Sequence, residues 1–281
     1  MAEQDISALK PDALSPAATE AKAESLGVGK ADMPAGKAFL LAILAGMFIA
    51  MGGMFMLLVK SDGSLGFAAS SLLGGLSFAL GLFLVICAGS ELFTGNCLMI
   101  MGKLSDKYSW GKLLKSWIVV WCGNLVGALI MVFLLFFANY YSMNGGAVGS
   151  TMLTVAAGKI APSWGTLVFK GIMCNILVCL AVWIGFAGRT IVDKFVTVLL
   201  PITAFVACGF EHCVANMFFL PMALTVKLAG VVDYAGSANI DVITLAGVLK
   251  NISAATVGNI IGGCIFVGLI YWAVYAKKNK D

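Results

Sequence analysis

Six apolar segments, each long enough to cross a lipid bilayer, constrain the fold more than any other feature of the sequence. A spanning helix needs about 20 apolar residues, and the segments are Ala38–Val59, Phe67–Met101, Leu113–Phe137, Thr166–Ala187, Phe195–Val226 and Ser253–Tyr275. The chain is 60% hydrophobic and 11% charged, with a mean hydropathy of +0.98, whereas a soluble domain has about 25% charged residues. The sequence therefore predicts an all-α membrane protein with six transmembrane helices.

The chain divides into one membrane domain and two short tails. We expect residues 37–276 to form the membrane domain, preceded by a tail at 1–36 and followed by a tail at 277–281. The first 36 residues lack the apolar core of a signal peptide. Ser15, Pro16 and Gly27 predict the N-cap, first position and end of a short helix. A solvated tail is the simpler interpretation of this helix, and a lid or a contact between protomers is the alternative.

Basic residues predict the orientation, because lysine and arginine stay on the cytoplasmic side. With the N-terminus inside, thirteen of the 18 basic residues fall in inner segments. The outer five are Lys60, Lys159, Lys170, Lys227 and Lys250. We therefore expect a multi-pass membrane protein with both termini in the cytoplasm.

Composition gives no indication of nucleic-acid, metal or cofactor binding. The net charge of +4 is too small to indicate nucleic-acid binding, and no basic-aromatic patch supports it. The eight cysteines form no CxxC pair, and the chain has one histidine, so a zinc site is not expected. We expect no cofactor and read the cysteines as small packing residues.

Two of the apolar segments are interrupted by similar polar sequences. "GSELFTGN" at 89–96 and "GFEHCVAN" at 209–216 share the pattern Gly-x-Glu-x-x-x-x-Asn. The second contains His212, beside Glu211. Titratable groups are costly at membrane depth and usually serve a function there. We therefore expect the second and fifth helices to be broken near functional groups.

The interruptions belong to an internal repeat. "GNLVG" at 123–127 follows the first interruption, and "GNIIG" at 258–262 follows the second. Each repeat has three spans, so the two copies enter the membrane from opposite sides. Backbone groups freed by a break are tolerated only inside protein or along a wet cavity, and half-helix N-termini favour anions. This inverted 3+3 arrangement indicates a transport pathway.

The motifs resemble the formate/nitrite transporter family from about residue 20 to 276. The resemblance is carried by "AGSELFTGN" (88–96), "NLVGAL" (124–129), "CNILVCLAVW" (174–183), "GFEHCVANM" (209–217) and "GNIIGG" (258–263). It implies an aquaporin-like fold, a homopentamer with one pore in each protomer, and small monovalent weak-acid anions as substrates. The Asn-Pro-Ala boxes of aquaporins are absent from this sequence.

The resemblance also implies a substrate pathway. His212 matches the family's central pore histidine, and Thr94 matches the threonine that faces it. Asn175 matches an asparagine near the same point, and Glu211 matches the carboxylate before the histidine. Lys159, expected in an outer loop, fits the lysine that draws anions into the vestibule.

Two constrictions are implied in the same way. Phe78 and Phe205 match positions of the outer constriction, and Leu82 and Leu92 match positions of the inner one. By residue type alone, all four would be core residues.

The residues leave several structural alternatives open. His212 could bridge helices, and Thr94 could cap a half-helix by accepting from freed N–H groups. Glu211 has a repeat mate, Glu91, without a histidine beside it. This favours a carboxylate that anchors freed backbone N–H groups or partner helices. Because burial favours a neutral imidazole, His212 could hydrogen-bond a weak-acid anion or exchange a proton with it.

Transport of formate is the function that we expect, through a channel or a proton-coupled carrier. The stretch 175–195 resembles formate channels most closely, and nitrite and hydrosulfide are the alternatives. An intramembrane enzyme would need a nucleophile and base or paired carboxylates, which one histidine and two separated carboxylates do not supply. A membrane anchor would have no use for two broken helices.

Overall fold

The computed structural model describes residues 13–276, and within that range every regular element is helical. The predicted tail at 277–281 lies outside the described residues. Five helical stretches are long and apolar enough to cross a membrane. They are α2 (Ala35–Lys60), α3 with its π-helical end η2 (Phe67–Gly89), α5 (Trp110–Phe137), α7 (Trp164–Ala187), and α10 with η7 and α11 (Leu245–Tyr275).

Shorter helices complete the bundle. These are α1 (Pro16–Ala31), η3 (Gly95–Met99), α4 (Ile100–Leu104), η4 (Tyr140–Ser142), η5 (Asn144–Gly146), α6 (Ala147–Ile160), α8 (Ile191–Ala207), α9 (Cys213–Ala229) and η6 (Ile240–Val242). Helix α8 and the short apolar helix α9 together occupy the predicted fifth span.

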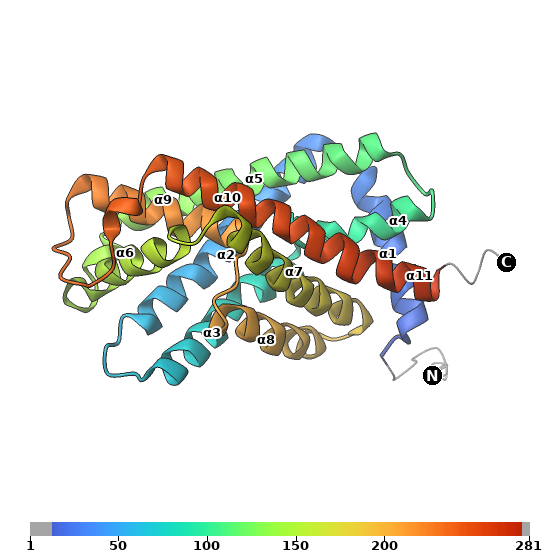
Figure 1. The fold of residues 1–281 in the computed structure, drawn as a ribbon. Coiled ribbons are helices and arrows are strands. Elements are labelled where there is room, and N and C mark those ends of the chain that lie inside the picture. The colour runs from blue at the N-terminus through green and yellow to red at the C-terminus, as the bar shows by residue number, and fades with distance from the viewer. Residues whose placement is uncertain (1–12, 277–281) are drawn as a thin grey trace, which may run out of the picture.

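Helix pairing in the first half of the chain corresponds to pairing in the second half. Helix α2 packs against α5 and α3, and α7 packs against α10 and α8 in the same order. Helices α1 and α6 lie at opposite ends of the bundle (Figure 1). This arrangement is consistent with an inverted repeat in which α1 and α6 each precede three membrane segments.

Glycine residues allow the helices to pack in close contact, as the small-residue spacing of these glycines predicts. A Cβ atom added at Gly127 of α5 would lie 2.0 Å from the Ile43 carbonyl oxygen of α2. A Cβ atom added at Gly258 of α10 would lie 2.2 Å from the Val168 carbonyl oxygen of α7. Both contacts leave no space for a side chain, which explains why the repeated Gly-Asn-x-x-Gly motif lies on these two helices.

Both predicted helix breaks are confirmed, and each begins at a glycine in the left-handed region. The φ angle is 82° at Gly89 and 68° at Gly209, a conformation that favours glycine. The first break continues as a 3₁₀ helix from Gly95. The second break is shorter than the predicted 209–216, because α9 resumes at Cys213.

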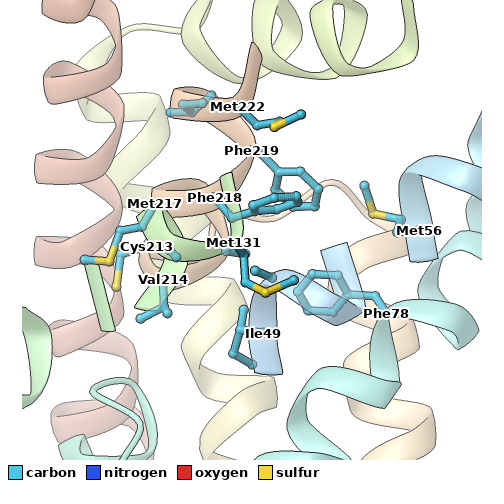
Figure 2. Close-up of a cluster of buried hydrophobic side chains, with 14 of the residues drawn as sticks. Ile49, Met56, Phe78, Met131, Cys213, Val214, Met217, Phe218, Phe219 and Met222 are labelled. Atoms are coloured by element: carbon cyan, nitrogen blue, oxygen red, sulfur yellow. The ribbon is translucent and has the colours of Figure 1, made fainter. Parts of the chain in front are cut away.

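Helix α9 lies at the centre of the bundle. Every residue from Cys213 to Leu220 is at most 4% exposed. Figure 2 shows side chains of this helix, including Phe218 and Phe219, beside Phe78 of α3. Because the first part of this helix is covered on all sides, the residues at its first turn are fixed in place.

The N-terminal helix departs from the expectation in two ways. Ser15 caps it as predicted, but it continues past Gly27 to Ala31. Gly27 packs against Tyr108, since a Cβ atom there would lie 3.0 Å from the tyrosine hydroxyl oxygen. The interpretation as a solvated tail is wrong for this helix, because α1 packs against α4, α7 and η3 and buries Glu20 and Glu24.

Candidate functional site

The two breaks meet through one hydrogen bond between side chains. Thr94 Oγ1 of the first break lies 2.9 Å from His212 Nε2 of the second. Thr94 is fully buried and His212 is 2% exposed. His212 therefore bridges the two breaks, as the structural alternative expected. Thr94 makes this bond in place of the helix cap that was its own alternative.

The hydrogen bond at Nδ1, the second ring nitrogen of His212, shows which nitrogen carries the proton of the neutral ring. His212 is the N-cap of α9, and the Ala215 N–H donates to Nδ1 over 3.0 Å. Because Nδ1 accepts this bond, a neutral ring carries its proton on Nε2. Nε2–H then donates to the Thr94 hydroxyl oxygen. A charged ring would need a proton on Nδ1, facing the Ala215 N–H.

Asn175 holds the Thr94 loop through the backbone. Its Nδ2 group donates to the carbonyl oxygens of Thr94, at 3.2 Å, and of Asn259, at 2.6 Å. The Cys179 thiol also donates to the Thr94 carbonyl oxygen. The Asn175 Oδ1 atom is buried and has no hydrogen-bond partner within the described residues. Asn175 therefore presents a free acceptor beside the loop that carries Thr94.

Glu211 is bound by side chains from three elements. Its Oε2 atom accepts from Asn216 at 2.6 Å, Asn251 at 3.2 Å and Lys159 at 3.3 Å. The expectation that it anchors partner helices is confirmed, since Asn251 lies on α10 and Lys159 on α6. These contacts involve no backbone N–H group, so that part of the expectation is not supported. Lys159 lies in the last turn of α6, which corrects its predicted place in a loop.

Glu91 is the matching carboxylate in the first break. It accepts from Asn96 over 2.8 Å and forms a 2.6 Å ion pair with Lys30 in the last turn of α1. Sequence reasoning missed Lys30, because the residue was placed in the tail. The internal repeat could have indicated this lysine. Glu91 and Glu211 occupy the same place in the two repeats, so a lysine partner for Glu211 implies a lysine partner for Glu91.

One asparagine in each half fixes the backbone of the break. Asn124 donates to the carbonyl oxygens of Ala42 and Glu91, at 2.8 and 2.9 Å, and accepts from the Phe93 N–H at 2.9 Å.

Asn259 repeats these contacts in the second half. It donates to the carbonyl oxygens of Gly171 and Glu211, at 2.8 and 2.9 Å, and accepts from the Cys213 N–H at 2.9 Å. The asparagine of the Gly-Asn-x-x-Gly motif thus satisfies the backbone groups that each break frees.

A cavity of about 200 Å³ reaches the histidine from the α6 end. It is lined by Glu211 and His212 and by three half-buried lysines, Lys60, Lys159 and Lys170. We call it the lysine cavity.

Aromatic rings flank the histidine at this cavity. Phe78 and Phe205 line it and meet edge to face with ring centroids 5.7 Å apart. Phe205 stacks on His212 with centroids 5.8 Å apart. Leu82 and Leu92 are 2% and 3% exposed in the apolar core and do not line the lysine cavity. The structure thus brings the phenylalanines to the histidine, whereas the leucines lie away from this cavity.

Comparison with known proteins identifies the family. The sequence profile of the formate/nitrite transporter family matches residues 17–273. The chain belongs to this family. Among similar proteins, formate channel FocA of Escherichia coli K12 is 39% identical over 275 residues, covering 95% of this chain and 96% of FocA. The uncharacterized transporter YrhG of Bacillus subtilis is 39% identical, over 97% of this chain and 96% of YrhG.

Solved structures of the family share the fold. A pentameric formate channel with formate bound superposes with a TM-score of 0.78, at 39% identity, and the match covers 86% of this chain and 98% of that one. An ion channel of the same family gives a TM-score of 0.80 at 29% identity, with 91% and 98% covered. The predicted all-helical membrane fold is confirmed, and the protein is a member of a transporter family.

Proposed function

We propose that this protein conducts formate across the bacterial inner membrane, through a pore in each protomer of a homopentamer. Family membership and similarity to a formate-bound pentameric channel support this proposal. The observation that carries it is the His212–Thr94 pair, whose histidine lines the lysine cavity. Nitrite and hydrosulfide are the alternative substrates, because the family profile includes nitrite and the site recognises small anions by charge and size.

Positive charge at the cavity mouth draws the anion inward. Lys159 is the residue that we assign to this step, and its ion pair with Glu211 fixes its position. The edge-to-face rings of Phe78 and Phe205 then oppose passage of a hydrated ion, because desolvating an uncompensated charge is costly. The anion must exchange water for donors of the protein.

The His212 geometry favours hydrogen bonding over direct proton donation. Nε2–H can leave Thr94 and donate to the anion while Ala215 still holds Nδ1. Giving up that proton would leave an imidazolate, unless the ring first gained a proton on Nδ1 and broke the cap. We therefore assign Nε2–H and the Thr94 hydroxyl as donors that replace water around formate. Asn175 holds the Thr94 loop and offers its free oxygen to a protonated acid.

The orientation follows from the distribution of basic residues. We propose that both termini are cytoplasmic and that the lysine cavity faces outward, since thirteen of 18 basic residues then lie inside. We also propose that the protein carries its substrate unchanged and is not an enzyme.

Flux through purified protein in proteoliposomes tests this function. Formate, nitrite and hydrosulfide are compared at acidic and neutral pH, with empty liposomes subtracted. We expect formate to pass fastest, and faster at acidic pH. Preference for another anion would replace formate as the substrate, and no flux for any of the three would contradict transport.

A further inference from the structure

The lysine cavity carries more positive charge than a monovalent anion needs. It is lined by Lys60, Lys159 and Lys170, with Glu211 as its acidic residue and His212 neutral in the assigned tautomer. The formal charge of this lining is therefore +2, from three ammonium groups and one carboxylate. Such a site favours a doubly charged anion over formate.

Two of the lysines lack the partner that the third one has. Lys159 pairs with Glu211 at 3.3 Å, whereas Lys60 and Lys170 form no ion pair within residues 13–276. They come from different helices, α2 and α7, so the fold brings separate charges to one cavity. Lys60 and Lys159 also line the same cavity, so their positive charges face one space. An anion between these groups would relieve their repulsion.

Access to the cavity is open from the α6 end. Lys60 also lines a neighbouring hollow of about 740 Å³ beside the loops that flank α6. That hollow contains tyrosine, serine and threonine hydroxyls and one carboxylate, Asp233. A hydrated oxyanion can therefore approach Lys60 through polar surroundings.

Passage beyond the cavity is closed to such an anion. Phe78 and Phe205, which are 2% and 3% exposed, line the cavity around His212. His212 lines the cavity beside them, and the donors of its pair with Thr94 suit one negative charge. An ion that keeps two charges at neutral pH would have to cross this apolar region without compensation, which is costly. It would remain in the cavity and exclude formate.

We propose that the lysine cavity is a binding site for a small doubly charged oxyanion, held by Lys60 and Lys170, which blocks the pore from the α6 end. This proposal rests on the proposed transport function for its inhibitory effect, but the binding site itself does not depend on it. It assigns Lys60 and Lys170 a role separate from that of Lys159 in drawing in formate.

Sulfate is the probe, because it stays doubly charged at neutral pH. Formate flux is measured in proteoliposomes with sulfate on both faces and sodium chloride at matched ionic strength as the reference. For each variant, flux with sulfate is divided by flux without it. We expect sulfate to inhibit the wild-type protein and its inhibition constant to rise about tenfold or more in Lys60→Gln/Lys170→Gln.

Two control variants test whether the change in sulfate inhibition comes from loss of positive charge, rather than from the altered side-chain shape or from a general loss of protein integrity. Lys60→Arg/Lys170→Arg keeps both charges and should keep most of the inhibition. Lys194→Gln changes a lysine on α8 that lies outside the cavity lining and should behave as the wild type does. Equal sulfate inhibition in the wild type and the double glutamine variant would overturn the proposal, as would no inhibition of the wild type.

Calorimetry keeps this test independent of transport. Sulfate is titrated into the purified wild-type protein and the double glutamine variant in detergent. Binding to the wild type alone supports the site even if formate flux is absent, in which case only the transport proposal fails. Absence of sulfate binding to the wild type overturns the site whatever the flux.

Discussion

The two broken spans share a scaffold and differ in their chemistry. In each, a glutamate pairs with a lysine and with an asparagine five residues later, and a distant asparagine holds the backbone. When the two repeats are aligned, Leu92 of the first break corresponds to His212 of the second, and Val214 of the second corresponds to Thr94 of the first. The polar His212–Thr94 contact thus has two buried apolar residues at the corresponding positions. The comparison separates residues that hold the breaks from residues that we propose bind an anion.

The helices after the breaks differ for the same reason. His212 caps α9 through Nδ1, so a regular helix begins at once. Leu92 has no acceptor, and the first break continues as a 3₁₀ helix without a side-chain cap. One histidine therefore both fixes the helix start and presents Nε2 to the other break.

The largest effect is expected at the shared asparagines. Asn124→Leu and Asn259→Leu each leave one carbonyl group and one N–H group of a break without their partner, at about 1–3 kcal/mol for each buried group. Both variants should lose several kcal/mol of stability, to a similar extent. Thermal unfolding in detergent measures this loss, with Lys194→Gln as the control. A large loss of stability in only one of the two variants would contradict a scaffold that is shared by the two breaks.

An intermediate effect is expected at the two ion pairs. The Lys30–Glu91 pair is shorter than the Lys159–Glu211 pair, at 2.6 against 3.3 Å. Double-mutant cycles with Lys→Met and Glu→Gln should give coupling energies within about 0.5–3 kcal/mol, with the larger value for Lys30–Glu91. Thermal unfolding of the four variants in each cycle provides the values. A larger coupling for Lys159–Glu211 would show that burial outweighs distance here.

A further effect, which depends on pH, is expected at α1, the counterpart of α6. Burial and the neighbouring Glu24 carboxyl raise the pKa of Glu20 from 4.5 to about 8. Because the docked helix binds this proton more tightly, docking is favoured below pH 4.5 and weakens as pH rises through about 8.

Hydrogen exchange of α1 measures this pH dependence. Exchange should rise with pH in the wild type beyond the intrinsic chemical rate, and Glu20→Gln should reduce that rise. The exposed lysine variant Lys115→Gln is the control. If the exchange rate of α1 rose with pH as much in Glu20→Gln as in the wild type, Glu20 would be excluded as the source of the pH dependence.

Hydropathy and motif spacing predicted the spans and both breaks. A membrane span requires a long apolar run, and a break requires a polar interruption of that run, so both can be recognised in the sequence. Docking of α1 could not be predicted in this way. Its buried face includes Thr19, Glu20 and Glu24, so no apolar stripe indicates a contact. The pairing of Lys30 with Glu91 depends on that docking and was missed with it.

The site was predictable where a residue type was rare, and less so where contacts decide the role. His212 is the only histidine, and the family resemblance paired it with Thr94. The three donors on Glu211 and the free oxygen of Asn175 depend on side chains from several helices. The roles of Lys60 and Lys170 follow from the cavity that they share.

Formate flux in two His212 variants tests the central claim most directly. Asn can accept from the Ala215 N–H with its oxygen and donate to formate with its amide, whereas Leu restores the apolar residue of the first break. We predict that His212→Asn retains most of the flux and that His212→Leu loses roughly tenfold or more. Wild-type flux in His212→Leu would contradict a hydrogen-bonding role for His212. Equal loss in both variants would show that the imidazole must titrate.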